Sequence, residues 1–251
     1  MERLTFKAFR APDEPGLCDE FLREHRKVLE DFGIENVTTN TASWTTDPNT
    51  YVIVAISDRS GMVGGIRVEV DNGTRELHIC EALAKLDPKI RSTLERLSGA
   101  GNAEVCGLWN ANRYSSKGLP TLLAFAAVSL ANQIGLRSMV CLVAHYTLRH
   151  AMKAGFTVLE ELGNGGTFTY PIPSIRAIAM IIPDVISLSS SNAPYRHQLL
   201  SLRIRPEQSH TELLNGEQTI LDYRLQLSGK LIDLGAYRTI MDCRSEYAET
   251  A

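Results

Sequence analysis

Residues 103–134 read Ala103-Glu-Val-Cys-Gly-Leu-Trp-Asn110, then Ala-Asn-Arg-Tyr-Ser-Ser-Lys-Gly118, then Leu119-Pro-Thr-Leu-Leu-Ala-Phe-Ala-Ala-Val-Ser-Leu-Ala-Asn-Gln-Ile134. The first piece is apolar and has the length of a buried strand, the second is a polar loop, and the third has the length and the Ala and Leu content of a helix. A helix start leaves backbone N–H groups unpaired and carries partial positive charge. The stretch therefore predicts an anion-binding strand, loop and helix.

The residues around the predicted helix start fit this interpretation. Pro120 suits a first helical turn, because no N–H is needed there and the φ angle of proline is already helical. Gly118 would let the backbone approach a ligand closely, and Lys117 would add a point charge. The alternative is a plain strand-to-helix connection in which a Ser side chain caps the helix.

The composition is that of an ordinary globular protein. The chain has 251 residues, of which 44% are hydrophobic and 22% charged, and its net charge is −3. A chain of this length can bury one large core, either as a single domain or as a domain with an extension. The charge balance argues against nucleic acid as a partner.

Cysteine usage and the lack of long apolar runs predict a cytoplasmic protein without a membrane span. The five cysteines include no Cys-x-x-Cys pair and lie mostly in apolar runs, which is typical of reduced, buried thiols. The first residues lack the apolar region of a signal peptide, and no apolar run approaches the roughly 20 residues of a membrane-spanning helix. The six His residues have no ligand-like spacing to Cys or carboxylates, so no metal is predicted.

Hydrophobic periodicity predicts alternating strands and helices around the central stretch. A domain is predicted over 1–185, and a C-terminal extension over 186–251 is predicted to serve packing or oligomerisation, with a homodimer as one outcome. In that extension, 195–202 has a helical pattern and 219–227 a strand-like alternation. In the domain, strands are expected over 4–10, 51–57, 62–70, 103–110, 138–144, 156–160 and 175–182, and helices over 17–32, within 71–101, over 119–134 and over 146–154.

This element order, with a phosphate-type loop at its centre and a short helix ending in Gly-Phe, resembles the GNAT superfamily of acyl-CoA-dependent N-acyltransferases over about residues 1–182. The loop pattern of that family is Arg or Gln, two residues, Gly, one residue, then Gly or Ala, and residues 115–120 occupy its positions. The Lys and the first Gly match, whereas Ser and Pro replace the first and last positions. A later family segment is matched by His145, Lys153, Gly155 and Phe156, and Ala151 stands where the family often has a Tyr that protonates the departing thiolate.

The resemblance implies an α/β (α+β) fold with a central mixed, mostly antiparallel sheet flanked by helices. It implies an acyl-CoA such as acetyl-CoA as co-substrate, and two central strands that splay apart to admit its pantetheine arm. The residues that would hold this arm are Cys106, Leu108 and Asn110. The pyrophosphate would then lie on Ser115, Ser116, Lys117, Gly118 and Leu119.

A second similarity is to the acyl-homoserine-lactone synthases, a GNAT-like branch that uses acyl-carrier protein and S-adenosylmethionine. That branch has a Trp, an acidic loop, a Tyr that opens a strand, and a Gly-x-Arg-Leu strand, and Trp44, Asp47, Tyr51 and Gly65-Ile-Arg67-Val follow the same order. The Glu-x-Ser-Arg segment of that branch corresponds to Glu104-Val-Cys-Gly107, in which the Glu matches and the Arg does not.

Acyl transfer from a thioester to an amine needs a base for the amine proton and N–H groups for the oxyanion. Glu104 on the central strand is the predicted base, since burial would raise its pKa toward the working range. The alternatives are an exposed Glu104 or a structural ion pair with Arg67. Glu69 and Glu81 are second choices for the base and are expected to be solvated.

Four other residues are considered for chemistry or binding. Arg67, in an apolar strand, would grip the carboxylate of an amino-acid acceptor, together with Trp44 as a substrate-binding residue. His145 ends a predicted strand and would act as acid or base, with a structural role as the alternative. Cys106 has no His at a recognisable spacing and is predicted to be an inert, buried thiol.

The sequence thus predicts an acyltransferase that moves an acyl group from acyl-CoA to an amine of a small-molecule acceptor. One alternative is an acyl-homoserine-lactone-synthase-like enzyme, which would need a basic patch for acyl-carrier protein. The other is a catalytically silent GNAT-fold module that binds a ligand. The residues that would form the basic patch are Arg91, Arg96, Arg113, Lys117 and Arg149.

Overall fold

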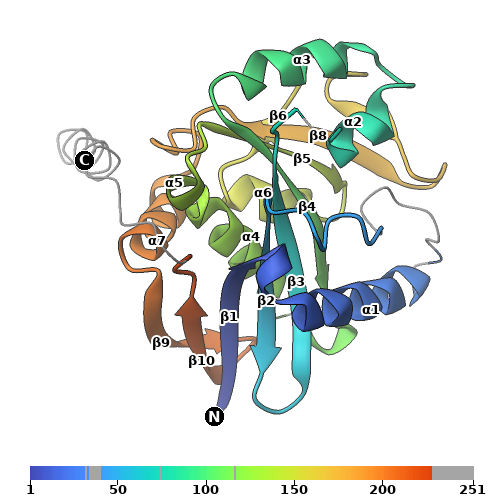
Figure 1. Cartoon of the computed structure of the whole chain (residues 1–251). Coiled ribbons are helices and arrows are strands. Elements are labelled where there is room, and N and C mark those ends of the chain that lie inside the picture. The colour runs from blue at the N-terminus through green and yellow to red at the C-terminus, as the bar shows by residue number, and fades with distance from the viewer. Residues whose placement is uncertain (32, 34–40, 74, 116, 228–251) are drawn as a thin grey trace.

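The structure, a computed structural model, describes residues 1–31, 33, 41–73, 75–115 and 117–227. In this part of the chain ten strands form one sheet, in the order β6-β8-β5-β4-β3-β2-β1-β10-β9 with β7 paired to β8 (Figure 1). The pairs β4–β5 and β1–β10 are parallel and the other pairs are antiparallel, so the predicted mixed, mostly antiparallel sheet is confirmed. The strands are β1 (Glu2–Arg10), β2 (Thr50–Ser57), β3 (Gly61–Val70), β4 (Asn102–Asn110), β5 (Ser138–Ala144), β6 (Thr157–Val158), β7 (Thr167–Thr169), β8 (Arg176–Ile182), β9 (Glu207–Leu214) and β10 (Glu217–Arg224).

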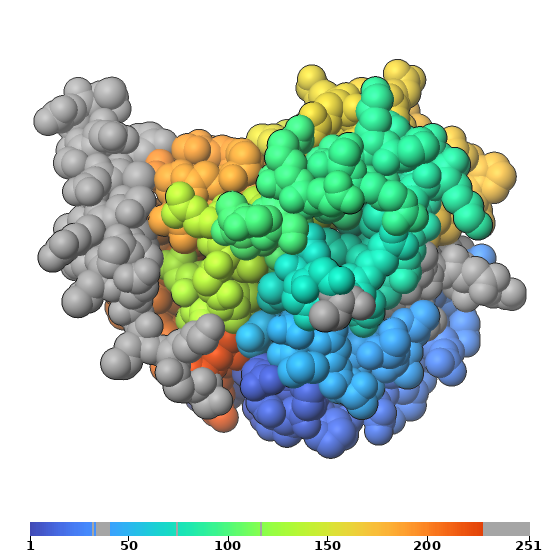
Figure 2. Space-filling view, turned by 45° about the horizontal axis from the view of Figure 1, so that its top comes forward, coloured from blue at the N-terminus to red at the C-terminus, as the bar shows by residue number. Residues whose placement is uncertain are grey.

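Helices cover both faces of the sheet. One face carries α1 (Pro15–Asp31), α2 (His78–Leu83) and α3 (Lys89–Ser98), and the other carries α4 (Leu119–Ser129), α5 (Ala131–Ile134), α6 (Leu148–Lys153) and α7 (Ala193–Ile204). In the space-filling view, the green surface of α3 borders the gold segment after β6 (Figure 2). Among the helices of the described residues, none is long and apolar enough to span a membrane.

Helix α1 packs directly on β3 because that strand carries a glycine at the contact. Cys18, Phe21 and His25 are three or four positions apart, so they share the face of α1 that is buried. A Cβ atom on Gly65 would lie 2.4 Å from the Phe21 ring, which is too close for any side chain. The Phe21 ring therefore lies against the backbone of β3, and this fixes the height of α1 above the sheet.

Helix α4 is apolar on nearly every side because it lies between the sheet and α7. Leu119, Leu123 and Phe125 are buried, and the same core includes Leu199 of α7 and Val68 of β3. A helix that is hydrophobic all round belongs in an interior. The predicted strand and loop of residues 103–118 are thus present, and the helix predicted over 119–134 is divided at Leu130 into α4 and α5, with α4 in the same core.

The strands β4 and β5 separate after their first residues. They are paired in parallel only over residues 102–104 and 138–140, although both strands continue beyond this point. On its other side β4 stays paired with β3 up to Asn110. The splay that the family resemblance implies therefore begins at Glu104.

The C-terminal residues up to 227 belong to the same core as the rest. Strand β10 pairs in parallel with β1, and Tyr223 stacks on Phe6 with ring centroids 4.8 Å apart. Leu200, Leu221 and Leu227 are buried in the cluster that contains α4. The helix and strand patterns expected over 195–202 and 219–227 are present. The expected extension from residue 186 therefore packs, as far as Leu227, as part of the sheet and its core.

Candidate active site

A cavity of about 400 Å³ lies where β4 and β5 separate. Its walls come from β4, β5, α1, α4, α6 and the segment around residue 170. Most lining residues are apolar, among them Ile66, Leu108, Leu142 and Phe156, as in typical ligand sites. The polar or titratable lining residues are His25, His78, Glu104, Cys106, Asn110, Asn112, Ser115, Cys141, Tyr146, Thr147, Arg149, His150 and Tyr170.

A bulge in β4 forms part of the cavity wall. Arg67 pairs with Cys106 and Gly65 with Trp109, so Gly107 and Leu108 have no register partner on β3. Gly107 has a φ of 59°, and a Cβ there would lie 3.0 Å from Nη1 of Arg67. A glycine is needed because of both the left-handed backbone and the guanidinium behind it. Two successive residues thus lie outside the β3–β4 ladder beside the cavity.

Glu104 lies at the point where the two strands separate. Its side chain borders the cavity but the residue is only 1% exposed, and its Oε2 accepts a hydrogen bond of 2.9 Å from the Ile79 N–H. Burial raises the pKa of Glu104 to about 7, although His78, the Ile79 N–H and the nearby Arg67 charge oppose the rise. At neutral pH this carboxyl group exchanges protons readily, which is the property of a general base or acid.

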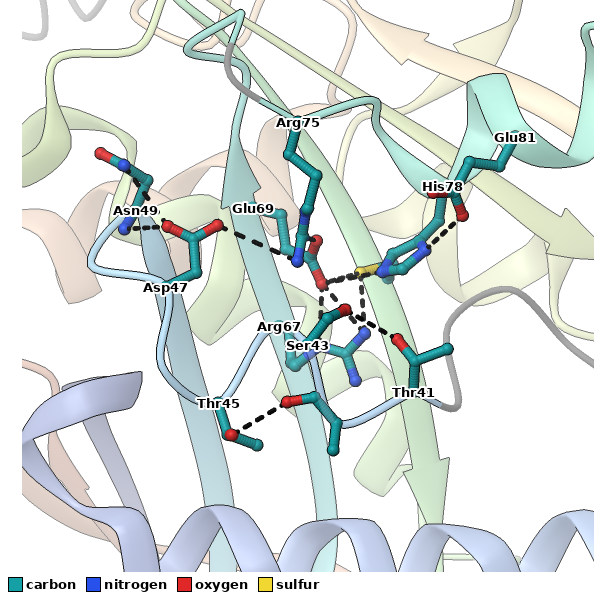
Figure 3. Close-up of polar contacts among 12 residues, drawn as sticks. Thr41, Ser43, Thr45, Asp47, Asn49, Arg67, Glu69, Arg75, His78 and Glu81 are labelled. Carbon is teal, nitrogen blue, oxygen red and sulfur yellow. Dashed lines mark hydrogen bonds and ion pairs between the residues drawn. The ribbon is translucent and has the colours of Figure 1, made fainter.

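Glu69 lies directly opposite Glu104 in the β3–β4 register, yet its surroundings are different. Its Oε1 is 2.9 Å from Nη2 of Arg67 and 3.4 Å from Nε2 of His78, and its Oε2 pairs with Arg75 (Figure 3). Glu69 is buried, which corrects the expectation that it is solvated. Arg67, for which an ion pair with Glu104 was one alternative, pairs with Glu69.

Arg67 and Trp44 lie behind the cavity wall. Both residues are completely buried, and the Arg67 guanidinium carbon is 4.4 Å from the Trp44 ring centroid. Phe21 adds a second ring at 5.6 Å. Neither Arg67 nor Trp44 borders the cavity. The predicted acceptor-binding pair is thus brought together as a cation–π stack, without direct access to the cavity.

The loop before α4 is only partly directed at the cavity. Ser115 and Pro120 border it, so the start of α4 faces the ligand space. Nζ of Lys117 instead lies 2.8 Å from Glu217 and 3.9 Å from Glu2. Gly118 precedes α4 in the left-handed conformation, Leu119 is buried in the core, and Ser116 lies outside the described residues.

The other predicted residues divide between the cavity and the surface. Cys106, Leu108 and Asn110 border the cavity along β4. His145 is exposed, its N–H donates to the Arg176 carbonyl, and the next residue, Tyr146, borders the cavity in its place.

Three cavity residues carry no recognisable signal in the sequence: His25, His78 and Tyr146. His25 is on the apolar face of α1, where a histidine is usually structural, and its helical spacing to Phe21 indicates only that it is buried. His78 begins α2, where its Nδ1 is 3.2 Å from Glu81, and no local motif precedes it. Burial lowers the pKa of His78 and raises the pKa of Tyr146.

Three of the five members of the predicted basic patch form ion pairs with carboxylates. Arg91 pairs with Glu76, Arg96 with Glu161, and Lys117 with Glu217. Arg113 donates to the Ser60 carbonyl, and Arg149 borders the cavity. Within the described residues, no group of three or more His, Cys, Asp or Glu side chains is arranged to hold a metal ion.

The architecture can be compared with that of known proteins. The structure of FeeM, an N-acyl amino acid synthase from uncultured soil microbes, superposes with a TM-score of 0.57 at 16% identity, over 78% of this chain and 99% of FeeM. The chain has the acyl-CoA N-acyltransferase fold. MesI, a CoA-dependent acyl-homoserine lactone synthase, gives a TM-score of 0.54 at 14% identity, over 80% of this chain and 95% of MesI. BjaI, another such synthase, solved with SAM and isopentyl-CoA, gives 0.54 at 15% identity, over 96% of this chain and all of BjaI (100%).

Sequence comparison adds nothing to this likeness. A scan against protein-family models gave no match, and a search of curated proteins gave none either. At these identities the structural likeness establishes the fold alone.

Proposed function

We propose that the protein transfers an acyl group from an acyl-CoA to the amine of a small-molecule acceptor. The observation that carries the proposal is the position of Glu104. It is a buried carboxyl group with a pKa of about 7, at the point where β4 and β5 separate and beside a cavity of about 400 Å³. FeeM is an N-acyl amino acid synthase, and MesI and BjaI are acyl-homoserine lactone synthases. These activities, in proteins of the same fold, support the proposed class of reaction.

The proposed reaction uses Glu104 as the general base. The carboxylate takes a proton from the acceptor amine as the nitrogen attacks the thioester carbonyl carbon. The C–N bond forms, the C–S bond breaks, and CoA leaves as a thiolate. Tyr146 borders the cavity, and because a tyrosine is protonated at neutral pH, its phenol is the proposed proton donor to the thiolate. Tyr146 would then protonate the departing thiolate, which Ala151 cannot do because its side chain has no acidic group.

The thioester is proposed to lie along the β4 bulge, with its acyl chain in the apolar part of the cavity. Gly107 and Leu108 lie outside the β3–β4 ladder, so backbone groups there are candidates for contacts with the carbonyl oxygen. Ile66, Val105 and Phe156 provide apolar wall for a medium or long acyl chain. The start of α4 at Pro120 is the proposed phosphate site.

CoA is the proposed donor in preference to acyl-carrier protein. Carrier protein presents an acidic surface and would need unpaired basic side chains. Arg91, Arg96 and Lys117 instead form ion pairs within this chain. We therefore propose acyl-CoA, a small-molecule thioester, as the acyl donor.

The direct test is a thiol-release assay with purified protein. Acetyl-, octanoyl- and palmitoyl-CoA are each supplied with a mixture of amino acids or with S-adenosylmethionine, and products are identified by mass spectrometry. We expect acceptor-dependent thiol release with the wild type and a loss of at least about 100-fold in Glu104→Gln. Tight acyl-CoA binding without any acceptor-dependent release would support the silent binding module instead. Release only with S-adenosylmethionine would support the lactone-synthase alternative.

A further inference from the structure

Among the residues that the structure describes, none is a hydrogen-bond partner of the buried His25. It lies on α1, is 4% exposed, and borders the cavity together with Val28 and Leu29 of the same helix. Nδ1 is completely enclosed and unpartnered, and among the described residues no hydrogen bond or ion pair involves Nε2 either. A buried polar group without a partner destabilises the fold, so such a group calls for an explanation.

The packing of the ring shows which nitrogen is available to a ligand. The ring stacks on Trp109 with centroids 6.5 Å apart and meets the edge of Phe21 at 5.9 Å. Because Nδ1 is the enclosed atom, Nε2 is the nitrogen on the cavity side. Buried N–H groups without partners are rarer than unsatisfied acceptors, so the ring proton belongs on Nε2, where a ligand can accept it.

The ring is neutral, and this defines the kind of ligand atom it suits. Burial lowers the pKa of His25 to about 3, and the charge of Arg67 lowers it further. A neutral N–H in an apolar wall suits an uncharged oxygen. For a phosphate or carboxylate, the free-energy cost of losing water there would exceed what one hydrogen bond from this donor returns. His25 also lies over Trp109, two residues beyond Gly107 of the β4 bulge.

We infer that Nε2–H of His25 donates a hydrogen bond to the carbonyl oxygen of the acyl thioester. The ring forms the α1 side of the carbonyl site, and the bulged backbone of β4 forms the other side. His25 is then a substrate-contacting residue that holds the thioester carbonyl in place for attack. This inference rests on the proposed function, since it takes an acyl thioester as the ligand.

The test compares two ligands that differ only in the carbonyl group. Octanoyl-CoA and its thioether counterpart, S-octyl-CoA, are titrated by calorimetry into the wild type and into three variants. We expect the wild type to bind the thioester roughly 3- to 10-fold more tightly than the thioether, which is the effect of one net hydrogen bond. His25→Phe keeps the ring packing on Trp109 and should abolish this difference without changing thioether affinity.

Two further variants separate the hydrogen bond from packing. His25→Gln places an amide N–H near the position of Nε2 and should keep part of the difference. His25→Asn places its amide near Nδ1 and should lose the difference, as His25→Phe does. Unchanged thioether affinity shows that each variant is folded.

The outcomes also separate this inference from the proposed function. If the wild type binds neither ligand, the proposed function fails. If the wild type binds both and His25→Phe leaves the thioester preference unchanged, the inference about His25 is overturned while the proposed function stands.

Discussion

The regions around Glu69 and Glu104 differ although the two glutamates face each other on neighbouring strands. Glu69 is held by the guanidinium groups of Arg67 and Arg75 and by His78 (Figure 3). The carboxylate of Glu104 accepts a hydrogen bond from the Ile79 backbone and borders the cavity. Both residues are 1% exposed, so burial alone does not separate them.

The difference shows how one sheet face can hold an ion-paired carboxylate and a carboxyl group with a raised pKa side by side. Buried charge is tolerated when it is paired, and Glu69 is paired with Arg67. Where pairing is incomplete, the proton affinity rises instead, as it does for Glu104, whose pKa is about 7. A base also needs free space beside it. The bulge at Gly107 and the separation of β5 from β4 leave such space next to Glu104.

The sharpest test of this comparison is Glu104→Gln. We expect turnover to fall 10²- to 10⁴-fold, because the amide keeps the shape of the side chain but does not accept the amine proton. Thioester affinity should be unchanged. Acyl-transfer rates and calorimetric titrations with octanoyl-CoA provide the two measurements. Full turnover in a well-folded variant would remove Glu104 from the reaction.

The stability of the same variant gives a second readout with a definite sign. The pKa of Glu104 is raised from 4.5 to about 7, so the folded state binds more protons than the unfolded state between these values. Wild-type stability should therefore fall as pH rises from about 4.5 to 7, by at most about 3 kcal/mol from this group, and Glu104→Gln should lack this fall. Urea unfolding of both proteins at several pH values measures the difference. Parallel stability curves would contradict the raised pKa.

We expect Glu69→Gln to lower the stability of the fold, in contrast to Glu104→Gln, which is expected to lower turnover. Arg67 is completely buried, and Glu69→Gln removes the carboxylate whose Oε1 lies 2.9 Å from its guanidinium. Such a change costs about 3 to 5 kcal/mol. Urea unfolding at pH 8 is the measurement, and Glu81→Gln is a matched control, because the Glu81 side chain is 40% exposed and contacts only the edge of the cluster at His78. A loss below about 1 kcal/mol would mean that the Glu69 pairing is dispensable.

The sequence predicted the fold well because local patterns carry it. The apolar run at 103–110, the loop and Pro120 define β4 and α4, and Tyr51 to Val70 reads as the β2–β3 hairpin that is present. The place of Glu104 on the central strand predicts a role beside a ligand, and the structure puts the residue at the edge of the cavity.

Pairing between distant residues could not be predicted in the same way. Glu69 lies two residues beyond Arg67 on the same strand, so strand alternation puts both side chains on one face, whereas Arg75 joins them from the loop before α2. Lys117 lies in the predicted phosphate loop, but β10, about one hundred residues later, brings Glu217 to its ammonium group. His25 and Tyr146 reach the cavity from α1 and from the end of β5, which no local spacing indicates.

The smallest expected effect concerns the charge of Glu81, which also acts on Glu104. Burial is the main cause of the raised pKa of Glu104, and the negative charge of Glu81 adds to it. If Glu104 is the base, the pH–rate profile has an acidic limb near pH 7, and Glu81→Gln should move this limb down by a fraction of a pH unit, because solvent screens a side chain that is 40% exposed. Glu76→Gln is the control, since Glu76 pairs with Arg91 and should leave the limb in place. An upward shift in Glu81→Gln, or equal shifts in both variants, would show that the limb belongs to a group other than Glu104.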